Sequence, residues 1–523
     1  MWMRYGFYFK LILLNYINIF NKNLINYFSG RYNENEFKSF RLKYGIYRQL
    51  NSYMIRFSIL CGKINIKQLL LFSYVSLKYD KYYLHLTTRT NIQLNWFNIF
   101  YSFEILKKIL YFFLNSIQSS GNCVRNITYY YIYKNFNPYP FCEILRQWFV
   151  CNSEFLFLPR KFKISVLNYK KDIIAFKEHD LGIYFKKNNL NNIKINISAG
   201  GGLGRTPTVG LYILKNINWK NLLNYCDKIL RIYNIYGFRN NIYKSRLKIL
   251  LKLIDVSKFL NFINKEFNYS INKIFFLNEK ELNSFFKYEN NLKFSFFKKN
   301  LIYFNFFFLN WIKFNIFNYN NIILPLKMLN KPSGDLNYIQ CKILYYFSND
   351  FFLHISVKQN LILKCYKYFF CYIKLKKYFI NIYNSNLITD NICCPGKDYC
   401  VLANSKSILI SNLIKNIFIN MNDIFKINKI YLNISGCINS CGHHHISNVG
   451  FLGLNKGGFE NYQVYIGGNY DNFKSSYFSK SFSKSFSYFK LSYYLIKIFK
   501  KFLLNNKYYN FLNFYNRLFI NQI

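Results

Sequence analysis

Acidic residues are scarce in this chain of 523 residues: 22 Asp and Glu stand against 71 Lys and Arg, which gives a net charge of +49. Alanine is almost absent, proline occurs seven times and histidine six times. Such a basic balance is usual for proteins that bind nucleic acid or anionic membranes. Here, however, lysine is spread over the whole length among Asn, Ile, Phe and Tyr. We therefore interpret the charge as a drift of the whole composition and predict no nucleic-acid binding.

Long apolar runs are also missing. The aromatic stretch 301–312 is shorter than the roughly 20 apolar residues that a membrane-spanning helix needs. Residues 1–20 carry Arg4 and Lys10 ahead of an apolar segment, but Asn interrupts that segment and no small-residue cleavage site follows. Their apolar spacing predicts an amphipathic opening helix instead. We expect a soluble, cytoplasmic protein that does not bind a membrane.

The thirteen cysteines carry the most specific signal. An odd number in a long chain without a secretion signal favours metal or redox use over a disulfide framework. Two close pairs stand out, Cys394 with Cys400 and Cys437 with Cys441. Soft sulfur ligands select an iron–sulfur cluster or zinc, and zinc pairs usually lie two to four residues apart. The wider first pair therefore favours a cluster, with Cys393 as the alternative first ligand.

The patterns before and after the middle of the chain predict a small α+β unit that occurs twice. Residues 53–60 are a strand candidate that carries Arg56, residues 66–79 are helical, and residues 83–94 alternate like one half-buried strand. Residues 352–363 align with 83–94 without a gap and share a Leu-His dipeptide with them. So distant a repeat indicates two related halves rather than a solenoid, whose periods are about 20–50 residues.

Basic residues and a glycine-rich loop lie between the two copies. A turn that begins with glycine presents Arg125. Residues 157–164 are a turn leading into a strand, in which period-two alternation puts Lys161 and Lys163 on one face. The glycines of loop 199–207 let backbone N–H groups approach an anion, but the loop has neither a Walker ending nor a dinucleotide fingerprint. By itself it is equally compatible with a structural turn.

Together, seven motifs resemble the sulfite/nitrite reductase hemoprotein family, whose members carry siroheme coupled to a 4Fe-4S cluster. They occur in the family's order and, with the repeat, cover most of residues 25–470. The motifs are Met54–Arg56, Leu86–Gln93, Asn122–Asn126, Leu158–Lys163, Gly200–Arg205, Cys394–Cys400 and Gly436–His445. The resemblance implies an α+β fold of duplicated ferredoxin-like half-domains and siroheme/4Fe-4S-binding domains, related by a pseudo-two-fold axis.

The resemblance also implies domain boundaries and residue roles. The boundaries are a helical extension 1–44, half-domains 45–112 and 318–385, a siroheme- and substrate-binding domain 113–317 and a 4Fe-4S/siroheme domain 386–523. The roles are cluster ligands Cys394, Cys400, Cys437 and Cys441, a substrate-binding quartet Arg56, Arg125, Lys161 and Lys163, and cofactor contacts Arg89, Gln93 and Asn439. Cys441 matches the ligand whose sulfur also binds the siroheme iron. We expect the histidines 443–445 to support the loop through hydrogen bonds rather than to bind metal.

The implied function is the six-electron reduction of sulfite to sulfide in sulfur assimilation, with assimilatory reduction of nitrite to ammonia as the alternative. No flavin or nicotinamide fingerprint is evident, so electrons would come from a separate ferredoxin or flavoprotein. Residues 215–315 depart so far from the family that none of its elements can be placed there. A rival of another class is a basic protein that binds nucleic acid, in which the cysteine pairs and ordered Arg and Lys motifs would lack a purpose.

Overall fold

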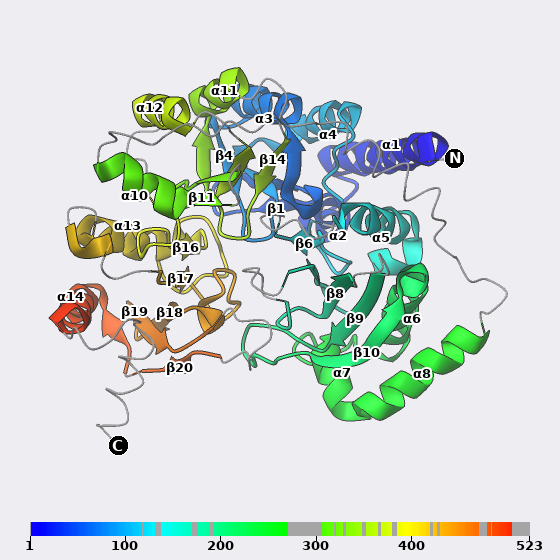
Figure 1. The fold of residues 1–523 in the computed structure, drawn as a ribbon. Coiled ribbons are helices and arrows are strands. Elements are labelled where there is room, and N and C mark those ends of the chain that lie inside the picture. The colour runs from blue at the N-terminus through cyan, green and yellow to red at the C-terminus, as the bar shows by residue number, and fades with distance from the viewer. Residues whose placement is uncertain are drawn as a thin grey trace.

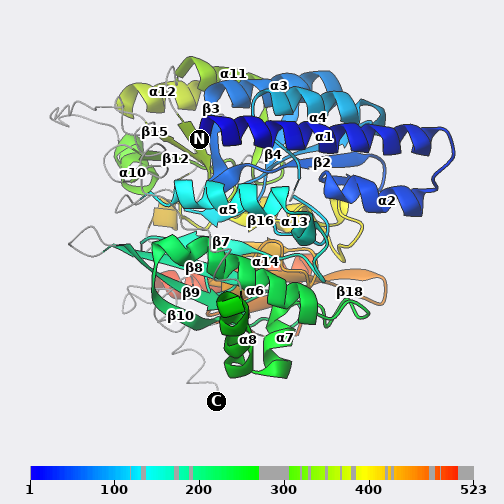
Figure 2. The same ribbon diagram turned by 90° about the vertical axis from the view of Figure 1, so that its right-hand side faces the viewer.

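The computed structural model describes most of the chain (Figures 1 and 2). The described ranges are 2–117, 119–130, 137–169, 176–187, 193–269, 306–317, 321–327, 331–347, 352–364, 368–378, 384–418, 422–425, 429–469, 478–482 and 484–504. Figure 1 shows an upper layer of sheets beneath a row of helices, and two further α+β lobes below it, at lower right and lower left. No helix within these ranges has the length and apolar character needed to cross a bilayer.

The upper layer contains two five-stranded sheets with matching topology. The first has the order β1 (Ile46–Arg48), β2 (Tyr53–Phe57), β5 (Ile92–Phe97), β4 (Tyr83–Leu86), β13 (Asp335–Asn337). The second has the order β11 (Ile316–Phe317), β12 (Asn321–Leu324), β15 (Leu361–Lys364), β14 (Phe352–Ile355), β3 (Lys63–Asn65). Each sheet therefore ends in a strand that belongs, in sequence, to the other copy of the repeat.

The exchanged strands confirm the duplication in their register. β13 pairs Asp335 with His85 of β4, and β3 pairs Lys63 with His354 of β14. The two aligned histidines thus occupy the same place in both sheets. In the first sheet the pair is also joined by side chains, with His85 Nδ1 2.7 Å from an Asp335 carboxylate oxygen. Both halves share one hydrophobic core, so the exchange makes them a single folding unit.

The segment 83–94 is a hairpin, and the expectation of one continuous strand was wrong. β4 and β5 are antiparallel, and the chain reverses between them with Thr90 at φ 57°. The hydroxyl of Thr87 accepts the backbone N–H groups of Arg89 and Asn91, which closes the turn. A threonine turn of this kind preserves the polar–apolar alternation of a strand, so the pattern did not reveal it. The second copy reverses at the equivalent Gln359, with φ 60°.

The two lower lobes also share one strand pattern. Their sheets have the orders β6 (Thr128–Tyr129), β7 (Ile164–Leu167), β8 (Leu181–Lys187), β9 (Ile193–Ala199), β10 (Leu211–Asn218) and β16 (Ile392–Cys393), β17 (Leu432–Ser435), β18 (Val449–Lys456), β19 (Phe459–Ile466), β20 (Lys480–Ser481), with β21 (Phe486–Ser487) also on β19. In both, the first three strands are parallel and the next two pairings antiparallel. The duplication therefore extends beyond the hairpins in which the sequence showed it.

Helices cover the sheets and confirm two local predictions. They are α1 (Trp2–Phe28), α2 (Glu34–Lys43), α3 (Ile66–Tyr79), α4 (Ser102–Tyr111), α5 (Tyr139–Cys151), α6 (Leu222–Tyr236), α7 (Leu247–Ile254), α8 (Val256–Tyr269), α10 (Phe306–Asn315), α11 (Tyr338–Phe347), α12 (Tyr368–Tyr378), α13 (Ser407–Phe418) and α14 (Tyr488–Leu504). α1 buries one apolar face that includes Leu13, Ile17 and Phe20 in the upper core, as an amphipathic opening helix should. α3 has the predicted bounds and begins with a capping box of Asn65 and Gln68.

Candidate active site

Both cysteine pairs leave the lower-left sheet at the same edge. β16 and β17 are parallel neighbours, so their carboxyl ends lie together, which is where α/β proteins place ligands. Cys394 follows β16, Cys437 follows β17, and the backbone N–H of Gly436 donates to Cys394 Sγ at 3.1 Å. Cys393 packs in the hydrophobic core of this lobe, whereas Cys394 is half-buried. The topology thus brings together two pairs that are distant in sequence.

The four thiols lie within electrostatic reach of one another. Burial raises the pKa of Cys394, Cys400 and Cys437, and the charge of Cys441 raises each of them further. Across the described ranges, no three His, Cys, Asp or Glu side chains converge closely enough to hold one metal ion. Zinc would need each sulfur about 2.3 Å away, whereas a cube with iron at four corners holds its cysteines farther apart. The spacing therefore fits a cluster better than a zinc ion.

Two arginines of the predicted quartet are oriented by carbonyl groups. Arg56 on β2 donates from Nε to Oε1 of Gln93 at 2.8 Å and from Nη1 to the carbonyl of Ser119 at 3.3 Å. Arg125 donates to the same carbonyl at 2.6 Å and to that of Gly121 at 2.8 Å. Carbonyl groups carry no net charge, so both guanidinium charges stay available to an anion. Gln93 is buried behind Arg56 and orients it.

Lys161 and Lys163 lie on the same side of the chain, as the alternation predicted. Phe162 between them is fully buried, while both lysines are half-buried. Burial lowers the pKa of Lys161 to about 8 and lowers that of Lys163 as well, and the thiol of Cys441 acts on both in the opposite direction. Arg56 also feels Cys441. The cation set and the cysteine set therefore form one site.

Arg89 and Asn439 complete the predicted positions. Arg89 stands in the turn between β4 and β5, with Nη1 3.0 Å from Nε2 of His179 and Nη2 donating to the carbonyl of Asn126 at 2.5 Å. Burial, and then the charge of Arg125, lower its pKa to about 9. Asn439 is exposed between the last two cysteines and donates from Nδ2 to the sulfur of its neighbour Cys437 at 3.6 Å.

An ion pair that the sequence did not reveal supports this cluster from behind. Asp180 is 1% exposed and accepts three hydrogen bonds of 2.7–3.0 Å from Arg246. It also accepts the backbone N–H of Lys163 at 2.9 Å. Arg246 directly precedes α7, within the part of the chain where no family element could be placed from sequence. A lone Asp and a lone Arg carry no local signal in so basic a chain.

Tyr47 on β1 is a second residue that sequence reasoning missed. The guanidinium carbon of Arg56 lies 5.5 Å from the centre of its ring. Burial opposes ionisation of the phenol, but the charges of Arg125 and Arg56 outweigh it and lower the pKa of Tyr47. With 50 tyrosines in the chain, only the fold distinguishes this one.

The site has an excess of buried positive charge and unsatisfied donors. Nε of Arg89 and Nε of Arg125 are buried without a hydrogen-bond partner. Buried charge is costly unless it is paired, and buried donors are nearly always satisfied. An anionic ligand would supply both the charge and the acceptors. The residues therefore fit the polycarboxylate siroheme and the small oxyanion that the family resemblance implies.

Hydrogen bonds tie the second cysteine loop to both neighbouring units. The hydroxyl of Thr88, in the upper layer, donates to the carbonyl of Cys441 at 3.1 Å. His445 donates from Nε2 to the carbonyl of Gly204, in the glycine-rich loop, at 3.2 Å. Burial lowers the pKa of His443 to about 3 and that of His445 to about 4, so both rings are neutral at pH 7. The predicted supporting role is confirmed for His445.

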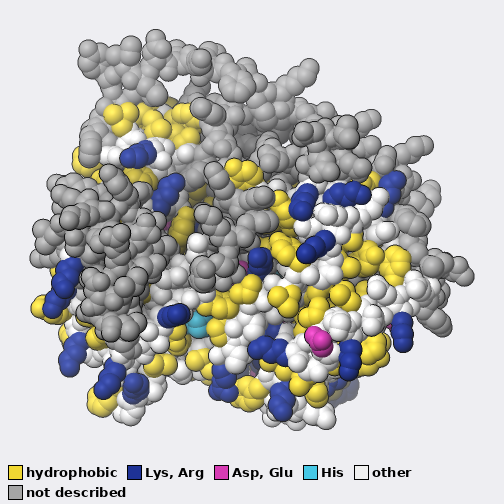
Figure 3. All heavy atoms as spheres, turned by 60° about the horizontal axis from the view of Figure 1, so that its bottom comes forward, with side chains coloured by type: hydrophobic (Ala, Val, Ile, Leu, Met, Phe, Trp, Pro, Cys, Tyr) yellow, Lys and Arg dark blue, Asp and Glu magenta, His cyan; other side chains and the backbone are white. Residues whose placement is uncertain are grey.

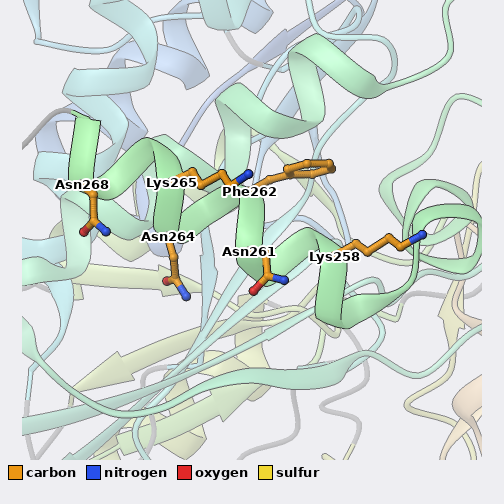
Figure 4. A pocket seen from close by; sticks show the side chains of 6 residues that line it. All are labelled: Lys258, Asn261, Phe262, Asn264, Lys265 and Asn268. Carbon is orange, nitrogen blue, oxygen red and sulfur yellow. The ribbon is translucent and has the colours of Figure 1, made fainter.

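Surface features outside this site show no competing centre. On the face in Figure 3, Lys and Arg side chains are dispersed among apolar ones rather than gathered in a stripe. A cavity of about 370 Å³ is lined by Lys258, Asn261, Phe262, Asn264, Lys265 and Asn268 (Figure 4). All six belong to α8, on the outer side of the lower-right lobe (Figure 1). The cavity shares no residue with the cysteine and cation site.

Comparisons with known proteins agree with the geometry. Residues 47–110 match a family model described as the nitrite/sulfite reductase ferredoxin-like half domain, and residues 120–271 match one described as the nitrite and sulphite reductase 4Fe-4S domain. The first match covers most of the first upper sheet, and the second covers the basic and glycine-rich motifs. The structure of the Mycobacterium tuberculosis NirA protein has a TM-score of 0.74, with 16% identity over 93% of this chain and 91% of that one. That likeness shows the fold.

Two curated relatives are similar over shorter stretches. Sulfite reductase [ferredoxin] 1 of Mycolicibacterium paratuberculosis is 23% identical over 187 residues, which are 35% of this chain and 33% of the relative. A sulfite reductase [NADPH] hemoprotein beta-component of Staphylococcus epidermidis is 24% identical over 255 residues, 42% of this chain and 44% of the relative. The matched part thus spans between a third and a half of these relatives' length.

Proposed function

We propose, from the premise that the chain belongs to the nitrite and sulfite reductase family, that it reduces sulfite to sulfide with six electrons. The observation that carries the proposal is the contact between two sets of residues. Lys161, Lys163 and Arg56 lie close enough to Cys441 for its charge to act on their pKa values. An oxyanion held by the cations would therefore lie beside the sulfur that ends the second cysteine pair.

The four basic residues would bind the anion and supply protons. Arg56 and Arg125 present guanidinium donors that carbonyl groups hold in place, and fixed donors of this kind stabilise charge that develops on oxygen. Lys161, with a pKa of about 8, can hold a proton on Nζ at neutral pH and release it. Loss of the substrate's oxygens as water needs such protons.

The cysteines and the remaining cations would hold the cofactors. Cys394, Cys400, Cys437 and Cys441 would bind the 4Fe-4S cluster, and Cys441 would also bind the siroheme iron. Arg89 would meet a siroheme carboxylate with its unpaired Nε, Gln93 would keep Arg56 in place beside the macrocycle, and Asn439 would contact the cofactors between the last two cysteines. When bound, the two cofactors supply electrons singly. A separate ferredoxin or flavoprotein would deliver them.

Anaerobic purification followed by visible and paramagnetic resonance spectroscopy tests the cofactors. We expect one siroheme and one cluster per chain, and turnover of sulfite by the protein with a chemical reductant. A protein reconstituted anaerobically that shows no siroheme absorption would refute the proposal. A higher kcat/KM for nitrite than for sulfite would establish the alternative substrate instead.

A pair of cysteine variants tests the shared ligand. Cys441→Ser should lose siroheme and activity, because oxygen is a poorer ligand than thiolate for this iron site. Cys151→Ser, a change at an exposed cysteine at the end of α5, should leave both unchanged. Full activity of Cys441→Ser would exclude the bridging role.

A further inference from the structure

The loop from Cys394 to Cys400 is contacted at both ends by residues from outside its own lobe. Inside the lobe, the loop is held by backbone and surface contacts, such as the N–H of Lys397 donating to Ser405 and the Lys397 ammonium 3.5 Å from Glu460. The two outside contacts come from the duplicated upper sheets, one from each copy. Neither belongs to the motifs that the sequence singled out.

Gln359 makes the contact at the Cys394 end. Its side chain is 1% exposed, and Oε1 accepts the backbone N–H of Cys393 at 3.1 Å. Nε2 donates to the carbonyl of Leu86, the last residue of β4, also at 3.1 Å. One amide thus joins the strand that leads into Cys394 to the hairpin of the first half. Gln359 adopts φ 60°, a conformation that residues other than glycine hold only where their surroundings impose it.

Tyr399 makes the contact at the Cys400 end. Its hydroxyl shares a hydrogen bond with that of Tyr83 on β4. Tyr83 is itself held by Trp96 on β5, whose indole N–H donates to the Tyr83 hydroxyl at 2.8 Å. The Tyr399 ring packs edge-on against Trp96, with ring centres 5.8 Å apart. The residue immediately before Cys400 is therefore fixed to the first hairpin by a hydrogen bond and a ring contact.

We infer that Gln359 and the Tyr83–Tyr399 pair are positioning residues that hold Cys394 and Cys400 at the separation the cluster requires. The inference rests on the proposed function, because it assigns these cysteines to a cluster. A loop free at both ends would sample several separations of its two thiols, and each departure would open a ligand position to solvent. Fixing both ends against a rigid sheet removes that freedom. The first half-domain thereby contributes to cluster retention although it supplies no cysteine ligand.

The test measures how fast the holoprotein loses iron to a ferrous chelator under anaerobic conditions. Tyr399→Phe removes only the hydroxyl, and Gln359→Asn keeps an amide and tolerates the backbone but is too short to reach both partners. We expect about a five-fold faster release for each hydrogen bond lost. Tyr82→Phe, at the exposed neighbour of Tyr83, is the matched control and should release iron at the rate of the unmodified protein. Iron and acid-labile sulfide per chain are measured before each run.

The thermal midpoint of each apoprotein separates positioning from general destabilisation. Faster iron release with an unchanged apoprotein midpoint supports the inference. Release at the unmodified rate overturns it, as does release that rises only in variants whose apoprotein midpoint falls. A wild-type protein that retains neither iron nor sulfide overturns the proposed function as well. A wild type that retains both while the variants hold iron equally well overturns the inference alone.

Discussion

Replacing Asp180 with asparagine tests whether the buried cations depend on a single carboxylate. Asp180 is 1% exposed and accepts three hydrogen bonds from Arg246 and one from the backbone of Lys163. Its charge also favours the protonated forms of Arg89 and Lys248. Asparagine has almost the same shape and keeps one oxygen acceptor. The substitution therefore removes charge and leaves the packing in place.

The expected loss follows from the contacts. Removing one partner of a buried ion pair costs about 3–5 kcal/mol, because the other charge stays buried and uncompensated. The acceptor that asparagine retains offsets about 1 kcal/mol of this. We therefore expect the lower-right lobe to lose about 2–4 kcal/mol of stability. At 1.36 kcal/mol per factor of ten, this is roughly a 30- to 900-fold more frequent opening.

Hydrogen exchange read by mass spectrometry on peptides from β7, β8 and α7 reports that opening locally. Asp255→Asn is the matched control, since Asp255 is exposed and caps α8 through the N–H of Val256, a role asparagine also performs. The control should change stability by no more than about 0.5 kcal/mol. Equal exchange in Asp180→Asn and Asp255→Asn would refute the view that the site carries uncompensated positive charge.

Three further predictions concern the loop, a buried lysine and the substrate. Gly201→Ala should destabilise the glycine-rich loop by about 1–3 kcal/mol, since an added Cβ would lie 1.9 Å from the carbonyl oxygen of Lys177, whereas Gly202→Ala meets only a flexible side chain at 3.2 Å and should be tolerated; equal urea midpoints would contradict this. Burial lowers the pKa of Lys358 to about 7, so above pH 7 the folded chain binds fewer protons than the unfolded chain and stability should rise by up to about 1.4 kcal/mol per pH unit between about pH 7 and 8.5; Lys358→Met should flatten that slope, and an unchanged slope would exclude the residue as its source. Arg125→Gln should raise the KM for sulfite about 10- to 150-fold, as expected for a lost hydrogen bond to a charged group of about 1.5–3 kcal/mol, and a KM within two-fold of the unmodified protein in the reductant assay would remove Arg125 from the binding quartet.

Local patterns predicted the local structure well. The bounds of α3 follow from its periodicity and from the capping residues Asn65 and Gln68, which act within one turn. The duplication was visible because both hairpins kept a common set of residues. The hairpin turn at Thr90 was missed because its hydrogen bonds preserve the alternation of a strand. A pattern of period two cannot separate these cases.

The sequence by itself determined the chemistry of the site. Ligand type and spacing are local properties, so two cysteine pairs and the basic motifs near Arg125 and Lys161 indicate a cluster and an anion without any knowledge of the fold. Only the tertiary structure decided which other groups act on them. Asp180, Arg246 and Tyr47 reach the cations from separate sheets and helices. Their effect depends on distance and burial, and neither property is encoded in neighbouring residues.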